Sequence, residues 1–162
     1  MDKDLEIKFV KELDSNQNIV HKICRIYTSN SHDHKDLFQE VTIQLWKAYP
    51  KFRGDSKFST WMYRIALNTA ITLYRKSTRR IKTNDLDAIH FKLKDEEPED
   101  DEHLKQLYKA IRWLTDIEKA LIFLYLEDTP YKDIATTLGI SEGNVRVKLN
   151  RTKNKLKQLL NP

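Results

Sequence analysis

The sequence predicts an all-α protein: two small helical domains joined by a flexible acidic linker. Apolar residues recur at helical spacing through both ends of the 162-residue chain, and no segment alternates as a strand would. Lys and Arg outnumber Asp and Glu by 16 to 9 in residues 1–82 and by 11 to 6 in residues 104–162. Residues 83–103 reverse the balance, with 2 basic and 9 acidic residues and no hydrophobic period. Such a segment cannot offset its ordering entropy, so it marks the domain boundary.

The composition excludes several classes of site. The three glycines never cluster, and a loop that cradles phosphate needs several converging N–H groups without Cβ atoms nearby. Cys24 is the only cysteine, so no intramolecular disulfide can form, and a reducing cytoplasm fits. Among its apolar neighbours, Cys24 is expected to be a small buried hydrophobe.

Charge and hydropathy also indicate where the protein works. The N-terminus has no signal-peptide pattern, and the longest apolar run, Ala120 to Leu126, is far short of the roughly 20 residues that span a bilayer. We therefore expect a cytoplasmic protein without membrane insertion. Two basic blocks flanking an acidic segment favour a polyanionic partner.

Residues 1–82 are predicted to be helical almost throughout, and two of the helices have boundaries that the sequence indicates. Residues 35–49 form an amphipathic helix that ends before Pro50. After a loop that ends at Lys57, another helix starts with Ser59 or Thr60 as its N-cap and continues into a basic run.

The C-terminal domain is predicted to hold four helices. The first carries Leu107, Ile111 and Leu114, and the second carries the apolar run around Phe123. The third and fourth helices span residues 129–138 and 141–159. In the third, Thr129 is the expected N-cap and Pro130 the first helical residue.

The last two helices have the features of a helix-turn-helix. Gly139 suits the left-handed end of the first helix, and Ser141 can cap the second. If Val145, Leu149 and Leu156 face the core, helical periodicity sends amide and guanidinium groups outward. Such groups can contact adenine and guanine edges in a major groove. The sequence therefore predicts DNA binding here, rather than an ordinary helical hairpin with a solvated face.

The N-terminal domain has a second kind of nucleic-acid signal. Residues 52–64 interleave aromatic and cationic side chains, a combination that holds single strands by base stacking and phosphate contact. Phe58 is expected to be core, whereas Trp61 is open to either a core or a binding role.

Taken together, these motifs resemble the sigma-70 family of bacterial RNA polymerase sigma factors, most closely the small extracytoplasmic-function (ECF) group. Residues 36–41 (DLFQEV), residues 52–66 (FRGDSKFSTWMYRIA) and Asn68 resemble region 2, and about the last 55 residues resemble region 4. The family often has an acidic residue four positions after the asparagine, where this chain has Thr72, and a leucine-proline pair where it has Leu114-Thr115.

The resemblance implies roles for named residues. The domains at 1–82 and 104–162 would be sigma regions 2 and 4. Residues docking on core RNA polymerase would be Asp36, Gln39 and Glu40, beside Phe38 and Ile43 as apolar neighbours able to be exposed. The unwound −10 element would meet Phe52, Lys57, Trp61, Arg64 and Asn68. The −35 element would be read by Asn144, Arg146, Val147, Lys148, Asn150 and Arg151. Promoter DNA and core polymerase would be the partners, with an anti-sigma factor as a further partner to test for.

Two other classes of function are compatible with parts of the sequence. A stand-alone helix-turn-helix repressor or activator would use residues 1–82 for sensing or dimerisation. A metalloenzyme would start from His32, Asp33, His34 and Asp36, although adjacent residues in a polar loop more often face water. We expect no enzyme activity, no cofactor and no metal.

Overall fold

The computed structural model describes residues 3–83 and 101–161. Within these ranges the chain forms helices and turns without a strand, so the predicted all-α class is confirmed. In chain order the helices are α1 (Lys3–Tyr27), α2 (Ser31–Ala48), the 3-10 helix η1 (Tyr49–Lys51), α3 (Phe58–Thr83), α5 (Glu102–Ile111), α6 (Asp116–Leu126), α7 (Tyr131–Leu138) and α8 (Glu142–Leu160). Most of the predicted linker, residues 84–100, lies outside the described residues. None of the described helices is long and apolar enough to cross a membrane.

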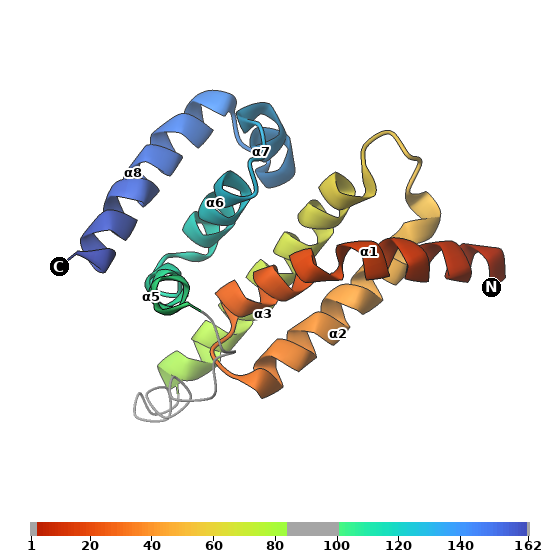
Figure 1. Ribbon diagram of the computed structural model, residues 1–162, viewed down its shortest axis with the longest axis horizontal. Coiled ribbons are helices and arrows are strands. Elements are labelled where there is room, and N and C mark those ends of the chain that lie inside the picture. Colours follow the sequence, from red (N-terminus) through yellow and green to blue (C-terminus); the bar gives the residue numbers. More distant parts are fainter. Residues whose placement is uncertain (1–2, 84–100, 162) are drawn as a thin grey trace.

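Helices α1, α2 and α3 form the N-terminal bundle (Figure 1). Along α2, Leu37, Val41 and Leu45 recur every four residues and are all buried, which is the predicted apolar stripe. Cys24 of α1 is fully buried in the same core, as predicted. Burial raises the pKa of the Cys24 thiol to about 12, so the thiol stays protonated and unreactive at neutral pH.

Helix α2 begins at Ser31, four residues before the predicted start. Asn30 caps it, because its side-chain oxygen accepts a hydrogen bond from the Asp33 N–H at 2.8 Å. Asn at an N-cap satisfies one of the N–H groups left free in a first turn. The segment expected to be a polar loop is therefore the start of the helix.

Helix α3 also begins before its predicted boundary. It starts at Phe58, so the predicted N-caps, Ser59 and Thr60, lie inside its first turn. The N–H of Trp61 already donates to the carbonyl of Lys57 at 3.1 Å. The core contact of Phe58, which is 7% exposed, fixes this first turn against the bundle without a polar cap.

Helices α5 to α8 form the C-terminal bundle. Helix α5 ends at Ile111, so Leu114 lies in the turn beyond it and not in the helix as predicted, although Leu114 is buried. A capping box then starts α6: Glu118 N–H donates to the Thr115 hydroxyl at 3.3 Å, and Thr115 N–H donates to the Glu118 carboxylate at 2.8 Å.

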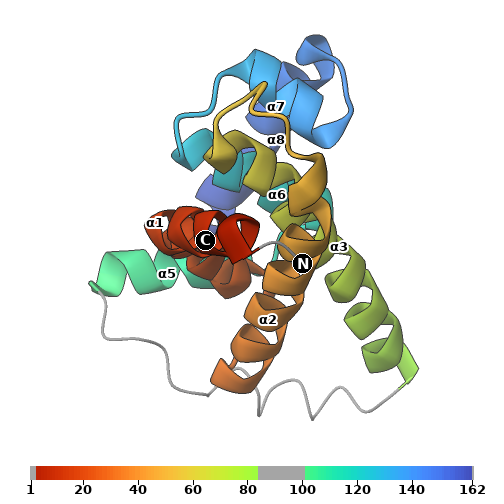
Figure 2. The ribbon, with the colours of Figure 1, turned by 90° about the vertical axis from the view of Figure 1, so that its right-hand side faces the viewer.

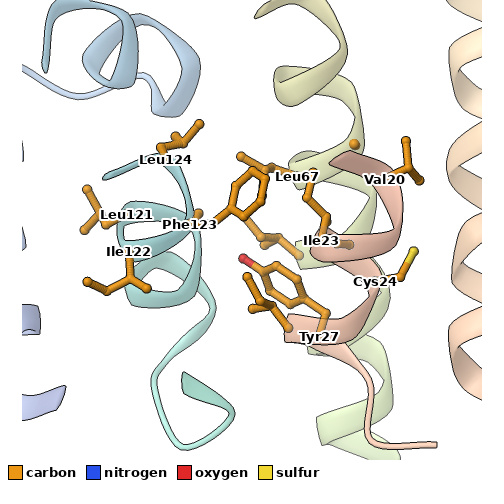
Figure 3. Close-up of a cluster of buried hydrophobic side chains, with 14 of the residues drawn as sticks. Val20, Ile23, Cys24, Tyr27, Leu67, Leu121, Ile122, Phe123 and Leu124 are labelled. Carbon is orange, nitrogen blue, oxygen red and sulfur yellow. The ribbon is translucent and has the colours of Figure 1, made fainter. Parts of the chain in front are cut away.

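Helix α6 joins the two bundles into one core. Six consecutive residues, Lys119 to Leu124, are buried, and a helix that is buried all round must have neighbours on every side. Figure 1 shows α8 on one side of α6 and α1 and α3 on the other. In the close-up of Figure 3, Phe123 points toward Leu67 of α3, and Leu121 and Ile122 lie on the opposite side of α6.

Candidate nucleic-acid interface

Helices α7 and α8 form the predicted helix-turn-helix. Gly139 ends α7 in the left-handed conformation with φ of 69°, as expected. The Ser141 hydroxyl caps α8 by accepting from the Asn144 N–H at 3.1 Å. The predicted cap of α7 is wrong: Pro130, with ψ of 145°, is the N-cap and Thr129 lies outside the helix. The extended ψ of Pro130 places the helix start one residue later.

Helix α8 has the predicted division into two faces. Val145, Leu149 and Leu156 are buried against the C-terminal bundle. The opposite side is exposed to solvent and carries Gly143, Val147, Asn150, Arg151 and Asn154, and the flanks carry the exposed Asn144, Arg146 and Lys148. A Cβ atom at Gly143 would meet only the Ser141 Oγ at 3.9 Å, so the start of α8 is open to an approaching phosphate.

Lys155 does not belong to this outward face. Its Nζ lies 2.9 Å from Oε1 of Glu118, and this ion pair ties α8 to α6. The guanidinium of Arg146 lies 5.8 Å from the ring centre of Tyr131, so α7 helps to orient it. Within the free protein, Lys155 is therefore held by an ion pair and Arg146 by a contact with an aromatic ring.

Four rings form an aromatic cluster where η1 meets α3: Tyr49, Phe52, Phe58 and Trp61. The centre of the Trp61 ring lies 4.9 Å from that of Phe52, 5.4 Å from Phe58 and 6.2 Å from Tyr49. Phe58 and Tyr49 are buried, whereas Phe52 and Trp61 are half-buried. The expected core role of Phe58 is confirmed, and Trp61 both packs on the cluster and keeps a surface toward solvent.

Tyr49 was missed by the sequence reading. Its signal was available, because it directly precedes Pro50 and lies three residues before Phe52. The Tyr49 ring stacks on that of Phe52 at 6.1 Å with an interplanar angle of 21°. Tyr49 therefore supports Phe52 from below the exposed surface.

Polar groups surround the aromatic cluster. Lys57, Arg64 and Asn68 are all exposed, and the two on α3 are one turn apart. Tyr63 is directed elsewhere: its ring packs edge-on against Phe123 of α6, with ring centres 5.8 Å apart. Burial, aided by a nearby carboxylate, raises the pKa of the Tyr63 phenol. Tyr63 is thus the member of the interleaved segment that faces the other bundle.

The face of α2 implicated in polymerase docking carries three residues: Asp36, Gln39 and Glu40. The first two are exposed, and Glu40 accepts a hydrogen bond from the side-chain amide of Gln44 at 2.9 Å. Ile43 is 45% exposed beside them. Phe38 is half-buried instead, because its ring stacks on His21 at 4.4 Å. Ile43 is therefore the more exposed of the two apolar neighbours considered on this face.

The four candidate metal ligands do not converge on one site. His32, Asp33 and Asp36 place their ligand atoms within 4.8 Å of one another on the surface of α2. His34 points away, and its Nε2 lies 2.9 Å from Nδ1 of His21. Burial and the nearby charges of His21 and Arg25 lower the pKa of His34. The Asn30 amide and His32 already engage the two carboxylates, so capping and pairing account for this arrangement.

Comparison with known proteins finds relatives for both bundles. Residues 13–80 match the family model of sigma-70 region 2, and residues 104–156 match that of sigma-70, region 4. The RNA polymerase sigma-H factor of Pseudomonas aeruginosa is 35% identical, over 88% of this chain and 82% of that protein. The ECF RNA polymerase sigma-E factor of Escherichia coli K12 is 32% identical, over the same two shares.

Solved structures share the fold at low sequence identity. The sigma factor RpoE of Bartonella quintana, solved in complex with the anti-sigma factor NepR, superposes with a TM-score of 0.71 at 21% identity, over 98% of each chain. CnrH, solved in complex with the cytosolic domain of CnrY, gives 0.68 at 20% identity, over 96% of this chain and 88% of that one.

A stand-alone repressor or activator would need only the helix-turn-helix, whereas the similarity covers both bundles in the same order. The chain therefore belongs to the sigma-70 family, in its ECF group, and acts as a sigma factor that binds core RNA polymerase and directs promoter-specific transcription initiation.

Proposed function

We propose that this sigma factor recognises its promoters with two separate surfaces. Residues 1–82 dock on core polymerase and hold the melted −10 element. Residues 104–162 read the −35 element as duplex, and residues 83–103 connect the two. The observation that carries the proposal is the pairing, in one chain, of an aromatic and cationic surface on α3 with an amide and guanidinium face on α8.

The −10 element is assigned to the surface around the aromatic cluster. Phe52 and Trp61 offer partly exposed rings for stacking, and Lys57 and Arg64 offer cations for phosphates. Asn68 lies seven residues beyond Trp61, which is close to two helical turns. Its exposed amide can donate to and accept from one base edge. An extruded base would thus meet an aromatic wall and an amide together.

The −35 element is assigned to the outward face of α8. Arg151, Arg146 and Lys148 supply cations, and Asn144 and Asn150 supply amides with both donor and acceptor groups. Val147 is 49% exposed and offers an apolar contact of the kind that suits a thymine methyl group. Bidentate contacts to guanine are made by Arg or Lys, so the uncharged Val147 and Asn150 limit the number of guanines that this face can contact.

Polymerase docking is assigned to Asp36, Gln39 and Glu40. The three lie within about one and a half turns of α2, next to the exposed Ile43. A polar rim around an apolar contact is common in protein interfaces.

A protein inhibitor and a cytoplasmic site of action complete the proposal. The two solved structures described above each hold a second protein, and this chain superposes on them over 98% and 96% of its length. We propose that an anti-sigma factor regulates this chain in the cytoplasm, where polymerase and promoters are found.

Transcription from a genomic DNA pool by core polymerase plus this protein tests the two-surface reading. Mapped start sites should share two upstream motifs at a fixed spacing. Asn68→Ala should degrade the downstream motif, and Arg151→Ala the upstream one. Asn18→Ala, an exposed asparagine on α1, is the matched control and should change neither. Start sites that share a single motif would contradict the two-surface reading.

Docking is tested separately by core polymerase pull-down. Replacing Gln39 and Glu40 together with Ala should weaken core binding while the helical content stays unchanged. The control replaces Gln17 and Glu12, the same residue types exposed on α1. Equal core affinity for both double variants would refute the assignment of the α2 face.

A further inference from the structure

The fold brings together two histidines that lie 13 positions apart in the sequence. His21 is an exposed residue of α1, and His34 is a half-buried residue of α2. Nδ1 of His21 lies 2.9 Å from Nε2 of His34. The ring centres are 5.2 Å apart and the ring planes are 21° from parallel, so with these nitrogens in contact the rings meet edge to edge. Both nitrogens therefore point into one small space between the rings.

Helices α1 and α2 hold the two rings in place. In Figure 1 the helices run in opposite directions from the turn that joins them, and Figure 2 shows α2 passing beside α1, which is seen there nearly end-on. Phe38 lies one turn after His34 on α2, and its ring stacks on that of His21 with ring centres 4.4 Å apart. His21 thus contacts two side chains of one face of α2, and the pair is positioned before any ligand arrives.

Two facing imidazole nitrogens are suited to bind a divalent transition metal. Zn²⁺ binds imidazole nitrogen at about 2.0–2.1 Å, and in tetrahedral geometry two such nitrogens are about 3.3 Å apart. The observed separation of 2.9 Å needs only a small widening, which rotation of the exposed His21 side chain can supply. In the free protein one nitrogen donates a hydrogen bond to the other. A neutral ring that carries its proton on the other nitrogen leaves both facing lone pairs for a metal ion.

The surroundings of the pair favour an exchangeable ion over a permanent one. Asp33 and Asp36 add negative charge within one turn of His34 on α2. The charge of Arg25, one turn after His21 on α1, also reaches His34 and opposes a cation. Among the residues that the structure describes, no third histidine, cysteine or carboxylate joins the pair within 4.8 Å. Water would complete the coordination, whereas structural zinc sites use four protein ligands.

We propose that His21 and His34 form a binding site for a divalent transition-metal ion, with Zn²⁺ as the representative of this class. A bound ion would link α1 to α2 on the two sides of the turn that joins them and would stabilise the N-terminal bundle. The site replaces the sequence-based expectation of a chain without metal. That expectation considered His34 only beside its neighbours in the sequence, and only the fold brings His21 to it.

Isothermal titration calorimetry of the free full-length protein with Zn²⁺ tests the site. Wild type should take up one ion per chain. His21→Gln and His34→Gln should each weaken uptake about tenfold or more, since even the partners of a metal ligand contribute that much. The double variant should lose little further, because both ligands serve one ion. His32→Gln, at an exposed histidine in the first turn of α2, is the matched control and should bind as wild type does.

Two outcomes of the titration would overturn the proposal. The first is the absence of saturable Zn²⁺ uptake by wild type. The second is loss of uptake in His32→Gln while His21→Gln retains it, because the ion would then lie on the surface group of His32, Asp33 and Asp36.

Two further measurements control for misfolding of the variants. Zn²⁺ should raise the thermal unfolding midpoint of wild type and His32→Gln but not of His21→Gln or His34→Gln, since only the folded state brings both ligands together. An equal rise in all four proteins would contradict the site. Paramagnetic Cu²⁺ needs no variant: it should broaden the NMR signals of the His21 and His34 rings before those of His32. The reverse order would also overturn the proposal. None of these experiments uses polymerase or DNA, so their failure leaves the proposed promoter recognition untouched.

Discussion

The −10 and −35 surfaces differ in the side chains from which they are built. Four aromatic rings gather around the start of α3, and the distance between the centres of neighbouring rings is at most 6.2 Å. Exposed cations and an exposed amide lie on the same part of the chain. Helix α8 contains no aromatic residue, and its outward face carries amides and cations. Stacking needs a base removed from the duplex, whereas amide and guanidinium groups can read base edges without unpairing them.

Under the proposed assignment, the two surfaces act at different steps. The C-terminal bundle can recognise closed duplex DNA, because every group that it offers suits a groove or a phosphate. The rings of the N-terminal bundle gain their contacts only after strand separation. Variants of the two surfaces should therefore separate initial binding from promoter opening.

The largest effect is expected from the aromatic cluster and its neighbour amide. Trp61→Ala and Asn68→Ala should lower promoter opening about 10- to 100-fold, because each removes a contact to an extruded base. Permanganate reactivity of unpaired thymines measures opening. Affinity for the closed complex should stay nearly unchanged, since neither residue acts on paired DNA.

Pre-melted promoter DNA sharpens this prediction. It should rescue Trp61→Ala more than Asn68→Ala, because stacking is sequence-tolerant and only the amide would read base identity. Thermal unfolding of both variants is the control, since Trp61 also packs against Phe52. Normal opening of linear duplex by both variants would assign these residues to packing alone.

The second effect concerns a single base pair of the −35 element. Arg151→Ala should cost about 1–3 kcal/mol and relax preference at one position, if the guanidinium contacts a guanine edge. Competition binding to a set of singly substituted −35 duplexes measures it. Arg53→Ala, an exposed arginine of the N-terminal bundle, is the control and should not change −35 binding. A uniform loss over all duplexes would place Arg151 on phosphate.

The third effect is on the packing of the two bundles against each other around Lys119. The Lys119 ammonium lies beside the rings of Tyr27 and Tyr74, and the charges of Arg112 and Asp116 act on it. The Asp116 carboxylate is itself paired with Arg75. Desolvation by burial, with Arg112 adding repulsion and Asp116 opposing it, lowers the pKa of Lys119 from 10.5 to about 8. A chain whose bundles have separated then binds more protons than the packed chain between these two values, so raising the pH through this window favours packing of the bundles.

Small-angle scattering from pH 7 to 9.5 measures this dependence. The fraction of wild-type chain with packed bundles should rise with pH, whereas Lys119→Met, which has no proton to release, should show a flat profile. A parallel rise in both proteins would show that groups other than Lys119 set the pH dependence.

Features governed by local sequence could be predicted, and the division of α8 is the clearest case. Gly139, Ser141 and the spacing of Val145 and Leu149 act within a few residues of one another, so the turn, the cap and both faces followed from sequence. The predicted start of α2 is wrong because Asn30 caps the helix before the expected boundary. The predicted start of α3 is wrong because Phe58 packs into the core and begins the helix before the expected N-caps, Ser59 and Thr60.

The joining of the bundles could not be predicted for a different reason. Residues 120–124 are apolar on every side of α6, and such a run does not reveal which neighbours will cover it. Lys119 is usually the type of residue found at a surface. Its burial depends on Tyr27 and Tyr74, more than 40 positions away in the chain. Contacts of that kind are set by tertiary packing alone.

The smallest effect is expected at Lys155, which tests how far the −35 face extends around α8. By helical periodicity Lys155 flanks the outward face and would contact phosphate. Its ammonium instead pairs with Glu118 at 2.9 Å. Although desolvation raises the pKa of Glu118, hydrogen bonds from Thr115 and Lys155 outweigh it, and the pKa stays below its ordinary value. The carboxylate is therefore charged, and it already neutralises the lysine.

Removing a cation that releases no counterion on binding should leave the salt dependence of DNA binding almost unchanged. Lys155→Ala should accordingly keep the slope of log affinity against log salt, whereas Lys148→Ala, at an exposed lysine on the same flank of α8, should reduce that slope by about one. Titration of a −35 duplex at several salt concentrations compares the two lysines directly. Equal loss of slope would mean that Lys155 leaves Glu118 for a phosphate when DNA binds, and that the face is wider than the free protein presents.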